Sequence, residues 1–145
     1  MARSKPVTPA APAGYSGTPL PKKLGIKPGS VVALLGAPKG FVKGTLGPLP
    51  EGTVLRDDTR AAFDVGLLFV GSKADLGKRF PAARKAMGEP CALWLCWPKK
   101  ASGVETDLDE NVIRDHGLLA GLVDYKVAAI DAVWSGLCFA RRRKG

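Results

Sequence analysis

Residues 91–107, CALWLCWPKKASGVETD, contain the transition that decides the predicted fold. Residues 92–97 form an unbroken apolar run, which is typical of a strand buried on both faces. After Pro98 the chain becomes polar, with Lys99, Lys100, Ser102, Glu105, Thr106 and Asp107. Thr106 or Asp107 can cap a helix that we expect to run to Leu119. A buried strand that ends in a polar loop before a helix is where open α/β sheets usually bind their ligands.

Four further apolar runs have the length and composition of strands. They cover residues 30–35, 61–70, 122–130 and 134–140. Only residues 131–133 separate the last two runs, so we expect these strands to be antiparallel neighbours. Residues 42–58 have the glycine and proline content of a loop, in which residues 53–55 can form a short strand.

Apolar side chains at three- and four-residue spacing predict a helix over residues 73–87. Its basic side chains, Arg79 among them, are expected to face the solvent. Pro81 should kink or divide this helix, because proline cannot donate the backbone hydrogen bond. Residues 20–24 can form one additional helical turn that ends at a glycine.

The order strand, loop, strand, helix, strand, helix, strand, strand predicts a single α/β domain over residues 18–140. The alternating middle implies parallel strands with right-handed crossovers, and the last two strands add an antiparallel hairpin. We therefore predict a three-layer, Rossmann-like, mostly parallel sheet with a C-terminal antiparallel hairpin. Residues 1–17, rich in Ala and Pro, are predicted to be a flexible tail, and residues 141–145 a basic tail.

The composition fits one domain with an ordinary hydrophobic core. The chain has 145 residues, of which 46% are hydrophobic and 24% are charged. No apolar run approaches the ~20 residues of a membrane-spanning helix, and residues 1–17 lack the apolar core of a signal peptide, so we expect a cytoplasmic protein. Cys91, Cys96 and Cys138 lie in apolar runs without a CxxC spacing, which favours buried thiols over disulfides or a zinc site.

The formal net charge is +9, and four of these charges come from Arg141, Arg142, Arg143 and Lys144. A basic excess permits binding to nucleic acid or to an acidic partner. The basic residues cluster at the chain ends, however, and the aromatic residues fall in apolar runs. We therefore favour a solvated basic tail over a nucleic-acid interface.

Longer stretches of the sequence resemble two known protein families. The segments GYSGTPLPKKLGIKPG, LLGAPKGF, LWLCWPKKASGVETDLDENVIR and GLVDYKVAAIDAVWSGLCFARR cover nearly the whole domain. They resemble an uncharacterised bacterial family, domain of unknown function three-zero-five-two, which implies a small cytoplasmic bacterial protein and no particular activity. More distantly, KLGIKPGSVVALLGAP and the final hairpin are similar to class I methyltransferases. That resemblance implies an S-adenosylmethionine site at the GAPKG loop, with Asp57 or Asp58 in the ribose-binding position.

The polar loop after residue 97 is the candidate ligand site. Its two cations and two hydroxyl groups, beside a helix N-terminus, would suit a phosphate or a carboxylate. These groups belong to Lys99, Lys100, Ser102 and Thr106. Trp97 would supply an apolar wall, and Trp134 and Ser135 would approach from the hairpin. In the alternative interpretation the lysines are solvated and Thr106 only caps the helix.

Gly36 and Gly40 lie in the turn after residues 30–35, which is the position of a phosphate-binding loop in nucleotide-binding sheets. The spacing does not match GxGxxG or GxxxxGK[ST], and Pro38 removes one backbone donor. We therefore favour a plain turn here over a phosphate cradle.

Two polar features elsewhere favour structural roles. Asp124 and Lys126 alternate with apolar residues, so both should point to the same face of a strand, where Arg114 can pair with Asp124. His116, the one histidine, lies near the end of a predicted helix and no serine or cysteine can be linked to it. One histidine without an acidic cluster makes a metal site unexpected.

The leading hypothesis is a non-catalytic module that binds an anionic small molecule or nucleotide. Its basis is a loop with cations and donors but without a recognisable acid, base or nucleophile. One alternative is a reduced S-adenosylmethionine-dependent methyltransferase that uses Gly36, Gly40 and Asp57 or Asp58. Another is an interaction protein whose basic ends bind nucleic acid or an acidic partner.

Overall fold

The structure, a computed structural model, describes residues 18–142. Its elements are, in order, α1 (Leu20–Leu24), β1 (Val31–Leu35), η1 (Val42–Leu46), β2 (Val54–Arg56), β3 (Phe63–Phe69), α2 (Lys73–Lys85), β4 (Met87–Pro98), η2 (Lys100–Ser102), α3 (Glu110–Leu119), β5 (Leu122–Ala129) and β6 (Trp134–Arg141). η1 is a short π-helix and η2 a short 3-10 helix. The predicted succession of strands and helices is confirmed, and η1 adds a helical segment to the region expected to be loop.

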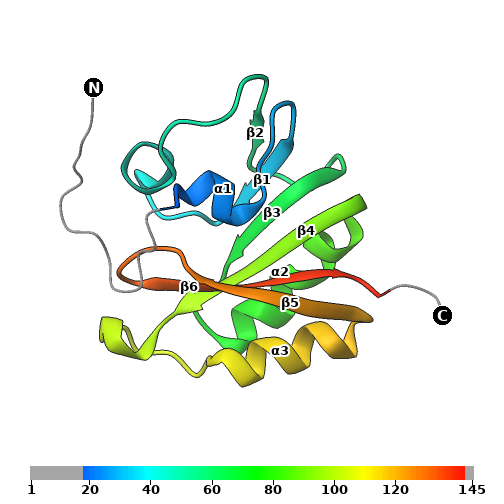
Figure 1. The fold of residues 1–145 in the computed structure, drawn as a ribbon. Helices are drawn as coiled ribbons and strands as arrows, with labels where there is room; N and C mark the ends of the chain where they lie inside the picture. The colour runs from blue at the N-terminus through cyan, green and yellow to red at the C-terminus, as the bar shows by residue number, and fades with distance from the viewer. Residues whose placement is uncertain (1–17, 143–145) are drawn as a thin grey trace.

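The six strands form one sheet in the order β2-β1-β3-β4-β6-β5 (Figure 1). β2, β1, β3 and β4 pair in parallel. β6 pairs antiparallel with β4 on one side and with β5 on the other. The final hairpin therefore forms one edge of the sheet, with β6 next to β4 and β5 outermost.

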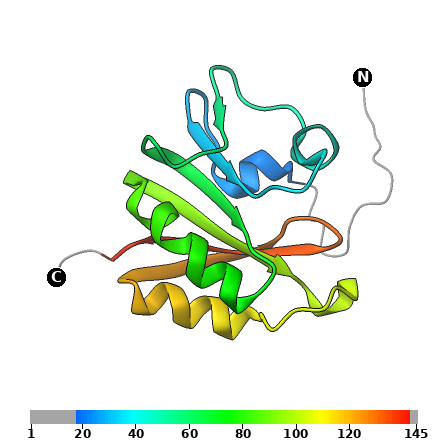
Figure 2. The ribbon, with the colours of Figure 1, turned by 180° about the vertical axis from the view of Figure 1, so that it is seen from behind.

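The predicted three-layer, Rossmann-like, mostly parallel sheet is wrong in two respects. The C-terminal half of the sheet is antiparallel, because β6 is inserted between β4 and β5. The described chain also has too few helices for two helical layers. α2 and α3 cover one face (Figure 2), whereas the other face carries only the five residues of α1 and the short η1. The fold is a mixed α/β sheet with one helix-covered face.

Two apolar clusters, one on each face of the sheet, form the core. Alternate residues of β4 enter them. Leu93 and Leu95 pack with α2 and α3, whereas Trp94 and Cys96 pack with α1. None of these four side chains is more than 1% exposed, so the unbroken apolar run of β4 reflects burial on both faces.

α1 is held on its face of the sheet by one buried hydrogen bond and by apolar contacts. The indole Nε1–H of Trp94 donates to the carbonyl oxygen of Leu24 at 3.1 Å, and both residues are buried. Gly25, at φ +86°, ends the helix in the left-handed region. Ile26 is then buried in the same cluster. These contacts fix the turn of residues 25–30 that leads into β1.

Pro81 does not divide α2, which is one helix from Lys73 to Lys85. Proline removes the hydrogen bond to the carbonyl group four residues earlier, here that of Gly77. Pro81 and Gly77 are both exposed, so water can satisfy this carbonyl group. α2 also ends before residues 88–90, which were expected to terminate the helix but belong to β4.

A β-bulge changes the direction of the side chains along β5. The register shifts between Asp124 and Lys126, which oppose two consecutive residues of β6, so Tyr125 is the extra residue. Asp124 lies on the α3 face and pairs with Arg114 at 3.0 Å, as predicted. Lys126 lies on the opposite face, where its ammonium group donates to the carbonyl oxygen of Lys23. The prediction that Asp124 and Lys126 share a face is wrong because it assumed a regular strand.

Residues 1–17, predicted to be a flexible tail, and residues 143–145 of the predicted basic tail lie outside the described residues. Arg141, expected in the C-terminal tail, is the last residue of β6, and its guanidinium group donates to the carbonyl oxygens of Met87 and Gly88. Between residues 18 and 142, no helix has the length and apolar composition needed to span a membrane.

Replacing Gly117 by alanine should destabilise the fold, whereas the same change at Gly77 should stabilise it. Both glycines lie within helices, where alanine is favoured by about 1 kcal/mol. A Cβ at Gly77 has nothing within 4 Å, so Gly77→Ala should raise the free energy of unfolding by about 0.5–1 kcal/mol. A Cβ at Gly117 would overlap the ring of Phe139 in β6, so Gly117→Ala should lower the free energy of unfolding by about 1–3 kcal/mol.

Urea unfolding of the two variants and the wild type measures both changes. Since the two substitutions are chemically identical, their difference reports the packing of α3 on β6. Stabilisation by Gly117→Ala would show that α3 does not approach the sheet this closely.

Candidate functional site

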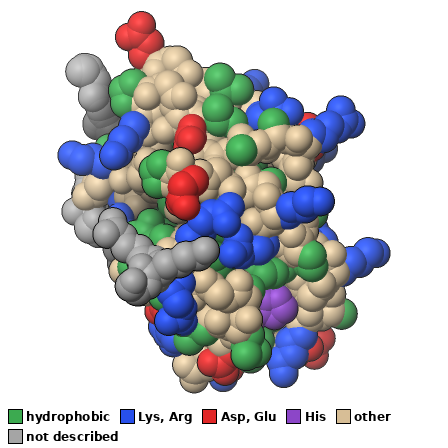
Figure 3. All heavy atoms as spheres, turned by 90° about the vertical axis from the view of Figure 1, so that its right-hand side faces the viewer, with side chains coloured by type: hydrophobic (Ala, Val, Ile, Leu, Met, Phe, Trp, Pro, Cys, Tyr) green, Lys and Arg blue, Asp and Glu red, His purple; other side chains and the backbone are tan. Residues whose placement is uncertain are grey.

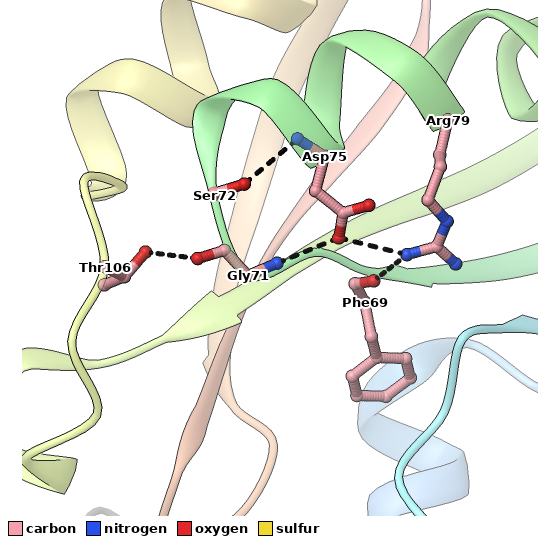
Figure 4. A network of polar contacts seen from close by, with 6 residues as sticks. All are labelled: Phe69, Gly71, Ser72, Asp75, Arg79 and Thr106. Carbon is pink, nitrogen blue, oxygen red and sulfur yellow. Dashed lines mark hydrogen bonds and ion pairs between the residues drawn. The ribbon is translucent and has the colours of Figure 1, made fainter.

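The loops that follow β3 and β4 meet at the edge of the sheet where these strands end (Figure 4). We call this edge of the sheet the carboxyl edge. The hydroxyl group of Thr106, after β4, donates to the carbonyl oxygen of Gly71, after β3, at 2.8 Å. The backbone N–H of Lys73 donates to the carboxylate of Asp107 at 2.8 Å. These bonds attach the candidate loop to the start of α2.

Arg79 of α2 connects the carboxyl edge with the glycine loop after β1. Its Nη1 donates to the carbonyl oxygen of Phe69 and to the carboxylate of Asp75, the latter at 3.3 Å. Asp75 also accepts from the N–H of Gly71 at 3.1 Å. The guanidinium group lies against Gly36, where a Cβ would overlap Nη2. The expectation that Arg79 faces solvent is wrong, because its long side chain reaches back over the strand ends.

The hydroxyl groups predicted to bind an anion form hydrogen bonds with nearby backbone. Ser102 Oγ donates to the carbonyl oxygen of Lys99 at 2.6 Å and accepts from the N–H of Val104. Thr106 Oγ1 accepts from the N–H of Leu108 at 3.1 Å, in addition to the bond that it donates. Each hydroxyl has one hydrogen, so neither has a donor left for a ligand.

Carboxylates occupy the N-terminus of α3. The N-cap is Asp109, whose side chain accepts from the N–H of Val112 at 2.9 Å, so the predicted caps Thr106 and Asp107 are wrong. Glu110 lies in the first turn. The positive end of the helix dipole is therefore compensated by side chains of the protein, which would repel a further anion.

The two tryptophans of the predicted site lie on opposite faces of the sheet. Trp97 is 5% exposed and packs with α2 and α3. Trp134 packs with the opposite cluster and meets the ring of Phe69 edge-on, with centroids 5.1 Å apart. Ser135 pairs with Trp97 between β6 and β4, and Gly40 lies in the glycine loop at φ +78°. The sheet separates the two tryptophans, so they form no common wall.

Asp57 and Asp58 follow β2, which pairs in parallel with β1. Oδ1 of Asp58 accepts from the N–H of Arg60 at 3.1 Å and from the guanidinium group of Arg56 at 3.2 Å. These bonds, that from Arg60 first, lower the pKa of Asp58. The carboxylate of Asp58 thus stabilises its own turn, while Asp57 is exposed beside it.

A cavity of about 630 Å³ lies at the opposite edge, where β1, β3 and β4 begin, and we call it the amino-edge cavity. Its floor is the sheet on the α1 face, with the small side chains of Ala92 and Ala140. The turn of residues 25–30 forms one wall, and Tyr125 and Lys126 of β5 contribute another. The cavity exists because α1 is too short to cover this part of the sheet.

Three ammonium groups, from Lys23, Lys27 and Lys126, line the amino-edge cavity. None of them is in an ion pair with a described residue. Lys126 Nζ donates to the carbonyl oxygen of Lys23 at 2.6 Å, and Lys23 Nζ donates to that of Ala129 at 3.5 Å. These bonds to neutral oxygens orient two of the cations and leave their charges uncompensated.

Asp64 supplies the negative charge in the lining. Its carboxylate accepts from the N–H of Val31, the first residue of β1, at 2.8 Å. Three ammonium groups against one carboxylate give the lining a net charge of +2 (3 − 1). Figure 3 looks onto this end of the molecule, where Lys and Arg side chains are spread around a few Asp and Glu side chains. The field in the cavity therefore favours an anion.

Sequence reasoning missed the amino-edge cavity because its lysines form no motif. Lys23 and Lys27 resemble residues of a surface turn, and 103 positions separate Lys23 from Lys126. The bulge at Tyr125 has no glycine or proline to signal it, so regular alternation placed Lys126 on the wrong face. The shortness of the predicted helix over residues 20–24 was the one usable signal, because five residues cannot cover a six-stranded sheet.

The thiols are poor nucleophiles at neutral pH. Cys91 lines the cavity, and burial raises its pKa to about 11. Burial also raises the pKa of Cys96 and Cys138, and all three cysteines are free. His116 packs edge-on against Phe80, and burial lowers its pKa. In the part of the chain that the structure describes, no three His, Cys, Asp or Glu side chains are grouped as a metal site.

Gly36→Ala should destabilise the protein more than Gly40→Ala. The two glycines have φ of +74° and +78°, so either alanine incurs the cost of a left-handed backbone, about 1–2 kcal/mol. Only at Gly36 does the new Cβ also overlap Arg79, whose bonds to Phe69 and Asp75 resist displacement. We expect the free energy of unfolding in urea to fall by roughly 1 kcal/mol more for Gly36→Ala.

The same pair of substitutions in an Arg79→Ala background provides the control. The difference between them should disappear when the guanidinium group is absent. A difference that persists would place the strain in the loop itself.

Iodoacetamide should modify Cys91 slowly at pH 8, and the rate should rise about tenfold per pH unit up to pH 10. The raised pKa leaves about one thiol in a thousand ionised at pH 8, and the thiolate is the reactive form. Mass spectrometry of peptides after timed alkylation measures the rate. The buried Cys96 and Cys138 should stay unmodified and serve as internal controls. A rate at pH 8 equal to that of free cysteine would contradict the burial of Cys91.

Comparisons with known proteins assign no function. No protein-family model matches the chain, and no curated protein sequence matches it significantly. The resemblance to domain of unknown function three-zero-five-two therefore stays a prediction. The function has to be inferred from the geometry of the two edges of the sheet.

Proposed function

We propose that the protein is a non-catalytic binding module for an anionic small molecule, and that the amino-edge cavity is its site. The observation that carries this proposal is the grouping of Lys23, Lys27 and Lys126 around one cavity that contains a single carboxylate. All 13 Asp and Glu residues of the sequence lie within the described residues. Of these 13 residues, Asp64 is the one that lines the cavity.

Electrostatics favour a ligand with more than one negative charge. Two unit charges 4 Å apart interact by about 1 kcal/mol in water and about 4 kcal/mol at the effective dielectric constant near a protein surface. The cavity is open to solvent, so the lower part of this range applies. Lysine is a compact point charge that does not require a bidentate partner, so it suits a phosphate as well as a carboxylate.

The volume of the cavity supports a metabolite-sized ligand, because small-molecule sites usually occupy roughly 300–1,000 Å³. The three free thiols are compatible with the reducing environment of the cytoplasm, where we place the protein. A methyltransferase-like cofactor site at the carboxyl edge has less support. Arg79 lies against Gly36 there, and the hydroxyl groups of Ser102 and Thr106 are engaged.

Inorganic phosphate, the simplest dianionic probe, should raise the Tm of the wild-type protein in a saturable way. Lys27→Gln and Lys126→Gln each remove one ammonium group and should weaken phosphate binding about 3- to 10-fold, equivalent to ~0.7–1.4 kcal/mol. Lys78→Gln is the matched control, because Lys78 is exposed on α2 and does not line the cavity. Thermal-shift titrations of the wild type and the three variants, each referred to that protein's own Tm without phosphate, measure the four affinities.

Added sodium chloride should weaken the binding further, since exposed charges are screened. If Lys78→Gln and Lys126→Gln weaken phosphate binding equally, the affinity depends only on the net charge of the protein. That result would contradict a defined site. Absence of any saturable shift with phosphate, pyrophosphate or citrate would remove the proposed function.

A further inference from the structure

The bulge in β5 places an aromatic ring beside the lysines of the amino-edge cavity. Tyr125 is the extra residue of the bulge and lines the cavity together with its neighbour Lys126. In a regular strand these two successive side chains would point to opposite faces. Here both reach the α1 face, because the bulge adds one residue to β5 without a partner in β6.

The hydroxyl group of Tyr125 fixes how this ring lies. It accepts a hydrogen bond from the thiol of Cys138 in β6, at 3.2 Å between Sγ and the oxygen. Cys138 is only 1% exposed, so the tyrosine must lie down across β6 to reach it. The side chain nevertheless stays 59% exposed. The ring therefore presents an outer surface to the cavity while its hydroxyl group is held underneath.

We infer that the anionic ligand of this cavity carries a planar aromatic ring that stacks on Tyr125, with a phosphate group near Lys126 and Lys23. This inference rests on the proposed function, whose anion-binding lysines it uses. The ligand would thus be a mononucleotide or another aromatic phosphate.

Three features of the lining support this class of ligand. The sheet contributes the small side chains of Ala92 and Ala140 to the lining, beside the larger Trp94, which leaves room for a flat group against the sheet. Lys126 follows Tyr125 directly, so one ligand can reach both the ring and the ammonium group. A phosphate dianion suits the net charge of +2 of the lining better than a single carboxylate does.

Isothermal titration of the full chain with three phosphates tests the inference. The probes are adenosine 5′-monophosphate, ribose 5-phosphate, which lacks the base, and inorganic phosphate. Stacking of one base on an aromatic side chain is worth enough to give at least about a 5-fold preference for adenosine 5′-monophosphate over ribose 5-phosphate. Tyr125→Leu should reduce this ratio to about 1, whereas Tyr125→Phe, which keeps the ring, should preserve it.

The possible results separate this inference from the proposed function. Equal affinities of wild type for the two organic phosphates, or an unchanged preference in Tyr125→Leu, would overturn stacking on Tyr125 and leave anion binding intact. Affinities that are unaffected by Lys126→Gln, or no binding of any probe, would overturn both. The Tm of each variant shows whether it is folded.

Discussion

A five-residue helix has to cover a sheet face whose opposite side is covered by two longer helices. α1 is held there by the hydrogen bond from Trp94 to the carbonyl group of Leu24, and it ends at Gly25. Beyond that point the sheet floor is open, and the amino-edge cavity results. The position of Lys23 follows from the same short helix, and the bulge in β5 brings Lys126 to meet it. The candidate site thus depends on incomplete coverage of one face.

The two edges of the sheet use their polar groups differently. At the carboxyl edge, Arg79, Asp75 and Thr106 satisfy strand ends and loop backbone, so this edge is closed by its own hydrogen bonds. At the amino edge, the ammonium groups of Lys23 and Lys126 donate to neutral carbonyl oxygens of the described residues. Ligands of open α/β sheets usually bind at the carboxyl ends of the parallel strands. Here a half-antiparallel sheet with few helices leaves its open, charged cavity at the other end.

Much of the local structure could be predicted, because apolar runs and their spacing report burial directly. The unbroken run of β4 and the short connection of residues 131–133 identified a central strand and a hairpin correctly. The insertion of β6 into the sheet could not be predicted, since strand order depends on contacts between distant residues. Nor could the bulge at Tyr125, because residues 123–127 alternate between apolar and polar as they would in a regular strand. The carboxyl-edge loops do meet, but the direction in which the hydroxyl of Thr106 donates is visible only in three dimensions.

Backbone ¹H–¹⁵N spectra of the full chain, recorded during a titration with inorganic phosphate, compare the two edges in one experiment. If the uncovered face is the binding site, the largest saturable shifts will be those of Gly29, Tyr125 and Lys126, while Gly36 and Gly71 at the carboxyl edge stay unchanged. Largest shifts at Gly36 and Gly71, with the amino edge unaffected, would contradict this account and return the site to the loops after the parallel strands.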